Sequence, residues 1–495
     1  MRTVLYRLYL IKMNALLVLI LLLLVSCSTV NETKGQEVLE QNIEIITIDT
    51  SVRTHPVSKN PGGVVSCWLL DSDIERPRKT SFTDAMKEMS VKYIRFPYGH
   101  LADNYLWDAD NDWGNTLTPK IATASQAPAS WDWAVNQATG EFIKDMDFDE
   151  YISICNNVDA EPMVVVNILS YKYKNGPTYQ QLKESAIEWV RYANVTKGYN
   201  VKRWALGNEV DHHSDLISQE EYKALYTDFA TAMKNVDPTI MIGPGLLGNW
   251  HASLLAHDPD NIDFICVHNY LYKYDWRNQD YEGWKNADDN LINNVEKCQN
   301  AVNNSSIPDT EIHVTEMNSR PWKDKSDSDD IFRGLAYGEM LLNACSFEDV
   351  KATYVWNTHG PWEGPEKNAP YNILDLDNNR EPRGDVIKII NENLLDYFVK
   401  VPRVNGFIRV YASIDESNEN LNIFLINKND TSEVVNLETS KFNLQSNYTI
   451  KSFSGNHPED KSPVYSEVAY NDLNDAILKV ELAPVSFNVI SVKLK

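Results

Sequence analysis

The sequence predicts an α/β fold: a (β/α)8 TIM barrel followed by a C-terminal all-β sandwich domain. Three observations support this prediction. The chain of 495 residues is long enough for one large barrel and a smaller second domain. From about residue 64, apolar strand-like segments alternate with stretches that carry apolar residues at helical spacing. After about residue 400 the segments are short, alternating and bounded by turns, without helical stretches between them, which is typical of a sandwich.

Eight apolar segments are candidate barrel strands. Buried strands that alternate with helices run parallel, and eight such units close a TIM barrel. Two aromatic-rich segments, 103–141 and 269–284, follow the second and sixth strands and are expected at the rim where barrel enzymes bind substrate. The candidate strands are residues 64–70, 91–99, 161–169, 201–210, 240–245, 263–270, 311–318 and 351–360.

The start of the chain has the features of an export signal. Three basic residues precede an unbroken apolar run of eleven residues, 15–25, which suits a signal peptide and is too short to span a bilayer comfortably. The run ends Leu-Val-Ser-Cys, and this resembles the lipobox of bacterial lipoproteins, with Cys27 as the lipidated residue. An ordinary secretion signal that happens to contain a cysteine is the alternative. We expect an exported protein that is lipid-anchored to the bacterial cell envelope.

These features divide the chain into five parts. Residues 1–26 are the predicted signal peptide and 27–42 a polar tether. Residues 43–63 contain an alternating strand that precedes the repeating pattern and is expected to join the sandwich. Residues 64–399 form the predicted catalytic barrel, and 400–495 the sandwich.

Charge and cysteine content exclude several classes of partner. The formal net charge is −24, and such a surface repels nucleic acid and anionic membranes, so contact with a membrane is expected only through the lipid anchor. The five cysteines after Cys27 are widely spaced, odd in number and without a CxxC motif, which indicates neither a disulfide framework nor a zinc site. The 13 Trp and 25 Tyr are enough for a core and for flat apolar ligands such as sugar faces.

Two of the candidate strands end in a glutamate. The fourth, VKRWALGNEV, ends in Asn208-Glu209, and the seventh, EIHVTEMN, carries Glu316 near its end. A carboxylate at the end of a buried strand is costly unless it is hydrogen-bonded or used in chemistry. The carboxyl ends of barrel strands meet at one rim, so a pair of carboxylates is expected there. Acid/base cleavage of a glycosidic bond requires such a pair.

These motifs resemble the clan A glycoside hydrolases, which are retaining (β/α)8 enzymes with an Asn-Glu pair after strand 4 and a Glu after strand 7. The similarity is greatest to the α-L-arabinofuranosidases of glycoside hydrolase family 51. It includes RFPYGHLADNYLW (95–107), FDEYISICNNVDAEPMVVVN (148–167), WALGNEV and TEMN. Tyr98 and His100 depart from it, because a tighter glycine turn is expected there. Agarases and porphyranases of the same clan share this outline.

The resemblance implies roles for the strand-end residues. Glu209 is the expected general acid/base, which requires a raised pKa, and Glu316 the expected nucleophile. Their carboxyl groups should lie about 5–5.5 Å apart, the separation of a retaining enzyme. Asn208 is expected to hydrogen-bond the sugar 2-hydroxyl. The alternative for each glutamate is a structural carboxylate in a salt bridge or cap.

Other polar residues near the strand ends are expected around this pair. His268 and Tyr270 are placed to orient or contact Glu316, although a satisfied core histidine is the competing interpretation. Arg95 ends the second strand and is expected to keep Glu316 ionised by charge pairing, or else to be a structural barrel arginine.

Aromatic residues are candidates for the sugar-binding surface. Trp356 ends the eighth strand and is expected to form the floor of a sugar subsite, with Asn167 as a polar contact. Tyr105, Trp107 and Trp276 are candidates for outer subsites, with loop packing as the alternative.

No metal or cofactor is predicted. Asp211-His212-His213 could suggest a metal, but adjacent histidines cannot share a helix face and no further ligand spacing is evident, so substrate-side loop residues are favoured. The acidic segment 375–378 lacks the spacing of a calcium loop, and a turn is expected.

The sequence therefore predicts a retaining glycoside hydrolase, α-L-arabinofuranosidase-like, that acts on plant or algal polysaccharide or oligosaccharide. An endo-acting agarase-, porphyranase- or xylanase-like hydrolase of the same clan is the alternative. A non-catalytic glycan-binding lipoprotein is an alternative of another class. The presence of both Glu209 and Glu316 in the expected contexts favours the enzyme.

Overall fold

The computed structural model describes residues 45–108, 117–271, 280–287, 291–319, 330–402, 406–438, 444–471 and 477–494. The chain divides into two units, 1–43 and 44–495, and the structure described below lies in the second. Cys27 and Trp276 lie outside the described residues. Within the described residues, no helix has the length and apolar character needed to cross a membrane.

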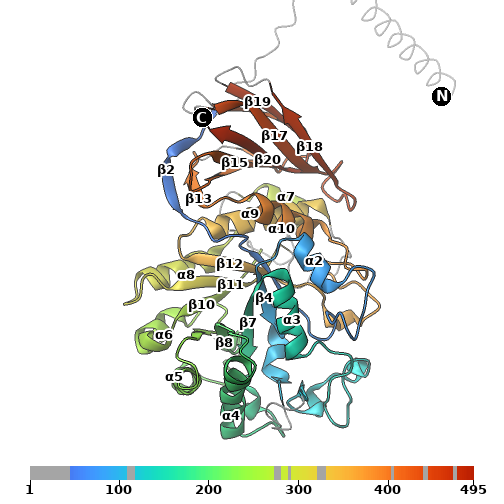
Figure 1. Cartoon of the computed structure of the whole chain (residues 1–495), viewed down its shortest axis with the longest axis vertical. Coiled ribbons are helices and arrows are strands. Elements are labelled where there is room, and N and C mark those ends of the chain that lie inside the picture. The colour runs from blue at the N-terminus through green and yellow to red at the C-terminus, as the bar shows by residue number, and fades with distance from the viewer. Residues whose placement is uncertain are drawn as a thin grey trace, which may run out of the picture. The chain divides into compact units, whose positions relative to one another are not determined.

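Eight parallel strands form a barrel, as predicted (Figure 1). Their order is β10-β11-β12-β3-β4-β7-β8-β9, and the Asp263 N–H donates to the Ile242 carbonyl (2.9 Å) where the two ends of this order meet. The strands are β3 (Gly62–Val65), β4 (Tyr93–Phe96), β7 (Glu161–Val166), β8 (Arg203–Leu206), β9 (Met241–Pro244), β10 (Phe264–Tyr270), β11 (Glu311–Asn318) and β12 (Val350–Val355).

Helices cover the outside of the barrel (Figure 1). Several begin at side chains that accept a hydrogen bond from the first turn, such as Asp147, Ser218 and Thr178, the last of which forms a capping box with Gln181. The α-helices are α2 (Phe82–Glu88), α3 (Phe148–Val158), α4 (Tyr179–Val190), α5 (Gln219–Lys234), α6 (His251–His257), α7 (Tyr281–Lys285), α8 (Asn293–Asn303), α9 (Ile331–Cys345) and α10 (Pro382–Asn393). The shorter helical turns are η1 (His100–Asn104), η2 (Ala124–Gln126), η3 (Ala129–Trp131), η4 (Ser170–Lys172), η5 (Arg191–Thr196), η6 (Val210–His212), η7 (Pro259–Asn261) and η8 (Pro361–Glu363).

The first barrel strand lies earlier in the chain than the sequence pattern indicated. It begins at Gly62 and ends at Val65, and residues 68–70 form turns. A Cβ at Gly63 would lie 2.6 Å from the Tyr93 carbonyl oxygen, so glycine permits the close approach of β3 to β4. The apolar residues after Val65 are buried in the core without being part of the strand.

The C-terminal part is a sandwich that includes the N-terminal strands (Figure 1), and its strand pairs are antiparallel except that β1 runs parallel to β16. A seven-stranded sheet has the order β18-β17-β20-β15-β14-β13-β2, and a three-stranded sheet has the order β1-β16-β19. Apolar residues from both sheets, including Ile46, Leu421 and Val480, form one core. The strands are β1 (Ile45–Thr47), β2 (Asp49–Pro56), β13 (Tyr397–Lys400), β14 (Ile408–Ile414), β15 (Asn420–Asn427), β16 (Glu433–Glu438), β17 (Leu444–Ser454), β18 (Val464–Tyr470), β19 (Ile477–Leu482) and β20 (Ser486–Leu494), and a separate hairpin joins β5 (Tyr105–Leu106) to β6 (Lys120–Ile121).

A buried ionic cluster joins barrel and sandwich at α9. Glu339 is 1% exposed and accepts hydrogen bonds from the Trp284 indole (2.7 Å) and the Arg409 guanidinium (3.0 Å). Lys428, which is fully buried, lies 3.1 Å from the same carboxylate. One carboxylate therefore compensates two cations of the sandwich.

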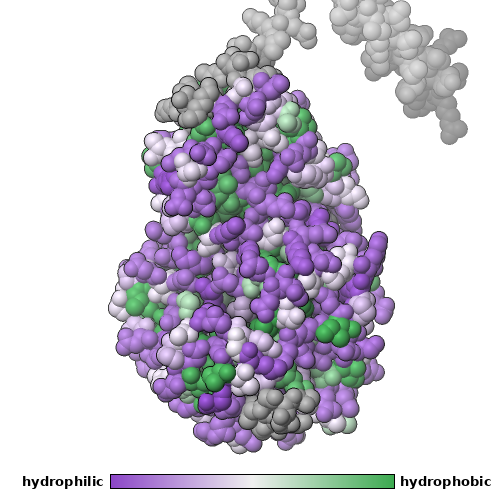
Figure 2. Space-filling view, in the orientation of Figure 1, coloured by the Kyte–Doolittle hydropathy of each residue, from purple (hydrophilic) through white to green (hydrophobic). Residues whose placement is uncertain are grey.

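Most of the visible surface is hydrophilic, with apolar residues in small separate patches (Figure 2). This agrees with the acidic composition of the chain, whose formal net charge is −24.

We predict that Glu339→Gln lowers the free energy of unfolding by about 3–5 kcal/mol, because it removes the negative charge that lies 3.1 Å from the buried Lys428 ammonium group. Urea unfolding measures this change. Glu339→Gln combined with Lys428→Met should recover part of the loss. The control is Glu392→Gln, which removes a partly exposed pair with Lys388 within α10 and should cost less than about 0.5 kcal/mol. Equal effects of the two single substitutions would contradict the prediction.

Candidate active site

Asn208 and Glu209 leave β8 through a tight turn. Gly207 has φ +81°, and a Cβ there would lie 2.5 Å from a methyl group of Val210, so only glycine fits. Glu209 itself is left-handed (φ +46°), which is uncommon for a side chain of this kind and is typical of functional sites. The Val210 N–H donates to the Gly245 carbonyl (3.1 Å) and holds the turn against the next loop. The turn places Asn208 inside and leaves Glu209 18% exposed.

Glu316 lies within β11 and is 3% exposed. Its Oε1 accepts a hydrogen bond from Arg95 Nη1 (2.9 Å), and its Oε2 accepts one from the Tyr270 hydroxyl (2.7 Å). The second Arg95 nitrogen, Nη2, donates to Asn208 Oδ1 (2.6 Å). Four barrel strands therefore contribute side chains around the buried Arg95 guanidinium of β4. The other three side chains come from β10, from β11 and from the turn after β8.

His268 lies between the two glutamates. Its Nδ1 is 2.7 Å from Glu209 Oε1 and 3.4 Å from Glu316 Oε2, and the side chain is fully buried. The shorter contact of His268 is thus with Glu209, whereas the sequence analysis predicted that His268 and Tyr270 both contact Glu316. One carboxylate oxygen of Glu209 lies within 4.8 Å of one of Glu316.

The pKa of Glu209 differs from the expectation of a raised value. Burial raises the pKa of this carboxyl group, but the hydrogen bond with His268 and the nearby His212 ring lower it, and the net direction is downward. His212 Nδ1 lies 3.7 Å from Glu209 Oε2, and this contact raises the pKa of His212. The neighbouring histidines therefore favour an ionised Glu209.

Trp356 follows β12 and packs beside Glu316. Its ring lies 4.4 Å, centroid to centroid, from that of Tyr98, and it is 3% exposed. A Cβ at Gly99 would overlap both Glu316 Oε1 and the Trp356 ring, so glycine is required where the chain passes this point. Tyr98, at a position where a glycine was expected, packs against the Trp356 ring.

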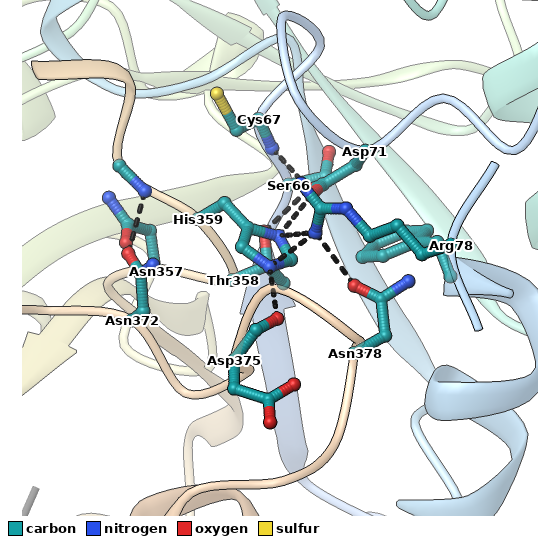
Figure 3. A network of polar contacts seen from close by, with 12 residues as sticks. Ser66, Cys67, Asp71, Arg78, Asn357, Thr358, His359, Asn372, Asp375 and Asn378 are labelled. Carbon is teal, nitrogen blue, oxygen red and sulfur yellow. Dashed lines mark hydrogen bonds and ion pairs between the residues drawn. The ribbon is translucent and has the colours of Figure 1, made fainter. Parts of the chain in front are cut away.

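A buried polar network holds together the loops that follow β3 and β12 (Figure 3). Asp71 accepts hydrogen bonds from the Cys67 N–H (2.7 Å), the Thr358 hydroxyl (2.5 Å) and the His359 ring (2.6 Å). Arg78 reaches His359 from the other side. The network joins the loop after β3 to the loop after β12, which carries Trp356, so it acts on the site through the position of that ring.

Three predicted substrate contacts have structural roles instead. Asn167 donates to the Tyr105 carbonyl (3.1 Å) and accepts from the N–H groups of Leu169 and Ser170, so its amide is used within its own loop. Tyr105 is 1% exposed, and Trp107, 2% exposed, stacks on Trp189 of α4 (5.7 Å). Both rings pack between the loop after β4 and the helices, which is the alternative that the sequence left open.

The three residues of the segment Asp211-His212-His213 make different contacts. Asp211 accepts hydrogen bonds from three consecutive N–H groups, those of residues 247–249, and anchors the loop after β9. His212 contacts Glu209, and the ring of His213 stacks on that of His100 at 5.1 Å. The sequence did not indicate the second pairing, because His100 follows a different strand.

Two clusters among the described residues have side chains close enough to hold a cation. One is Glu209, His268 and Glu316, where Arg95 already supplies a positive charge. The other is His100, Asp103 and His213, which has no such cation in hydrogen-bonding contact. Burial raises the pKa of Asp103 well above its usual range, although the Asn208 N–H and the Arg95 charge act in the opposite direction.

Comparison with known proteins agrees with this geometry. The model of the family described as the alpha-L-arabinofuranosidase 1 domain matches residues 85–288. An intracellular exo-α-(1→5)-L-arabinofuranosidase of Acetivibrio thermocellus is 25% identical over 206 residues, which are 38% of each chain. An enzyme of the same name from Halalkalibacterium halodurans is 22% identical over 287 residues, 54% of each chain. The chain therefore matches about half or less of the length of these curated relatives.

The same similarity extends to solved structures. The structure of the α-L-arabinofuranosidase from Thermotoga maritima in complex with arabinose has a TM-score of 0.69 at 18% identity, and the match covers 91% of this chain and 100% of that one. The comparisons give no support to the agarase and porphyranase alternative.

The fold and the site together define a (β/α)8-barrel protein of the clan A type, with Asn-Glu after the fourth barrel strand and Glu on the seventh. Within that class the chain is similar to the family 51 α-L-arabinofuranosidases in sequence over residues 85–288 and in fold over most of its length. The resemblance stated from the motifs is confirmed.

Proposed function

We propose that the protein is a retaining glycoside hydrolase that acts on plant polysaccharide or oligosaccharide and releases α-L-arabinofuranosyl groups. The observation that carries this proposal is the approach of Glu209 and Glu316 to within 4.8 Å between carboxylate oxygens. This approach is compatible with a retaining enzyme, whose carboxyl groups lie about 5–5.5 Å apart, and favours it over an inverting enzyme, at about 6.5–9.5 Å. The names of the relatives support L-arabinofuranose as the sugar that is released.

Glu316 is the nucleophile in the proposed first step. Arg95 and Tyr270 each donate a hydrogen bond to one of its two oxygens, which orients the carboxylate. Attack on the anomeric carbon forms the glycosyl-enzyme ester and breaks the bond to the leaving oxygen. Asn208 Nδ2 is buried and has no hydrogen-bond partner among the described residues, so it can donate to the sugar 2-hydroxyl.

Glu209 transfers the proton in both steps. It is the partly exposed member of the hydrogen-bonded pair with His268, at 18% against 0%, so it faces the substrate side. In the first step Glu209 acts in its protonated form, although the two histidines lower its pKa, and it gives this proton to the leaving oxygen. In the second, the carboxylate takes a proton from water as the water attacks the ester to Glu316. His268 shares a 2.7 Å hydrogen bond with Glu209 and positions it throughout.

We also propose that the protein is exported and anchored to the bacterial cell envelope by a lipid on Cys27, because the apolar run 15–25 leads into the Leu-Val-Ser-Cys motif of residues 24–27. In a bacterial host that processes lipoproteins, metabolic labelling with a radioactive fatty acid should mark the wild type. Cys27→Ala should remain unlabelled, and Cys67→Ala, which changes a buried cysteine, should be labelled like the wild type. Label in Cys27→Ala would exclude this anchor.

We predict that Glu209→Ala and Glu316→Ala each lower kcat/KM on arabino-oligosaccharides by at least about 10²-fold, since each removes a group that acts in the transition state. Azide distinguishes the two roles, because a small anion can enter the cavity left by either carboxylate. With an aryl arabinofuranoside, Glu209→Ala plus azide should give the glycosyl azide with retained configuration. Glu316→Ala plus azide should give the inverted product. NMR spectroscopy of the azide products reads the configuration.

Two controls accompany this experiment. Glu467→Ala changes an exposed glutamate of β18 and should leave turnover unchanged. A panel of aryl arabinofuranoside, xyloside and galactoside, with intact arabinan, xylan, agarose and porphyran, tests the sugar. Oligosaccharide release from a galactan, with no release from arabinofuranosides, would keep the chemistry and exclude the proposed substrate. Glycan binding without turnover on the whole panel would exclude the enzyme.

We predict that His212→Gln moves the basic limb of the pH profile of kcat/KM to higher pH. Along the basic limb, kcat/KM falls because the general acid loses its proton. His212 lowers the pKa of Glu209, so its removal raises this pKa and keeps Glu209 protonated to a higher pH. His257→Gln, an exposed change at the end of α6, is the control. An unchanged or lowered basic limb would contradict the assignment of Glu209 as the acid.

A further inference from the structure

Three side chains from two rim loops converge beside the Glu209–Glu316 pair. His100 and Asp103 belong to η1, which follows β4, and His213 comes directly after η6, which follows β8. One ligand atom from each of the three lies within 4.8 Å of those from the other two. None of the three has a role in the proposed hydrolysis.

Asp103 is the least expected member of this cluster. Its side chain is fully buried, and neither carboxylate oxygen makes a hydrogen bond of standard geometry to the described residues. Arg95, the cation whose charge reaches it, uses its two Nη groups on Glu316 and Asn208 instead. Within the part of the chain that the structure describes, the Asn208 N–H is the one donor that lowers its pKa. A buried carboxylate with so little compensation is costly, and such groups are normally paired or bind a metal.

The two histidines complete a set of ligands. The His213 Nε2 is buried and has no partner among the described residues, so a lone pair or a proton is available there. The exposed ring of His100 stacks on that of His213 with centroids 5.1 Å apart and an angle of 25° between the planes. Because His100 is exposed, its ring can turn toward the other two side chains without disturbing the core.

We propose that His100, Asp103 and His213 bind a divalent transition-metal ion of the Zn²⁺ class. Two imidazoles and one carboxylate are the donor types that Zn²⁺ takes, and three protein ligands leave a fourth position for water or a sugar hydroxyl. Ligand atoms at zinc distances of about 2.0–2.2 Å in a tetrahedron are about 3.3–3.6 Å apart, so a small closure from the present spacing forms the site.

The metal has a defined structural consequence. It joins the loop after β4, which carries Gly99 beside Glu316, to the loop after β8, which carries Glu209. One ion would then join the turn that carries Glu209 to the segment that passes beside Glu316. The metal acts as a clamp on the rim and takes no part in the proton transfers.

The test uses the full-length chain without an affinity tag, freed of metal by a chelator and titrated with Zn²⁺ in a calorimeter. We expect one strong site per chain and a rise in Tm on addition of Zn²⁺. His100→Gln and Asp103→Asn should each weaken this site by at least about tenfold, and the Zn²⁺-dependent rise in Tm should fall accordingly. His100 is exposed, so its substitution should leave the Tm of the metal-free protein unchanged.

Replacement of Zn²⁺ by Co²⁺ allows metal binding to be measured by visible absorption, independently of enzyme activity. The wild type should show the visible absorption of tetrahedral Co²⁺, and His100→Gln should lose it. His457→Gln, an exposed histidine of the sandwich, is the control for adventitious binding and should behave like the wild type. Zn²⁺ binding that is equal in the wild type and His100→Gln, or that is lost only on Glu316→Gln, would overturn the proposal.

Discussion

The contact between Arg95 and Glu316 is the interaction on which the rim of this barrel depends. Both side chains are almost fully buried, and a carboxylate at that depth is tolerated only with a counter-charge and hydrogen bonds. Arg95 supplies both and also reaches Asn208, so β4, the end of β8 and β11 are tied to one group. His268 extends the arrangement to Glu209, and the two glutamates are thereby held at a spacing that suits two-step chemistry.

Polar residues at this rim fall into two groups. Asp71, Asp211 and Asn167 use their side chains to hold loops, and their hydrogen-bonding capacity is taken up by the protein. Asn208 and Asp103 keep buried polar atoms that make no hydrogen bond of standard geometry with the described residues. Unused capacity of this kind is costly in a core, so it marks the places where a ligand is expected to complete the contacts.

Much of the fold could be predicted because its signals are local. Eight apolar segments at suitable spacing indicated the barrel strands, and each contains or overlaps an observed one. The boundary at Gly62 was missed, since the glycines that begin β3 owe their presence to the close approach of Tyr93. Tyr105 and Trp107 were placed at the substrate because aromatic residues in a rim loop are compatible with sugar binding and with packing alike. Only their contacts with α4 distinguish the two.

The sequence by itself determined the barrel, the sandwich and the pair Glu209 and Glu316, because strand patterns and strand-end motifs are properties of neighbouring residues. The tertiary structure decided which side chains meet across the rim. It placed His268 between the glutamates, lowered the pKa of Glu209, and brought His213 to His100 and Asp103. The physical reason is that closing a barrel juxtaposes the ends of strands that lie far apart in the chain, and no local pattern records that distance.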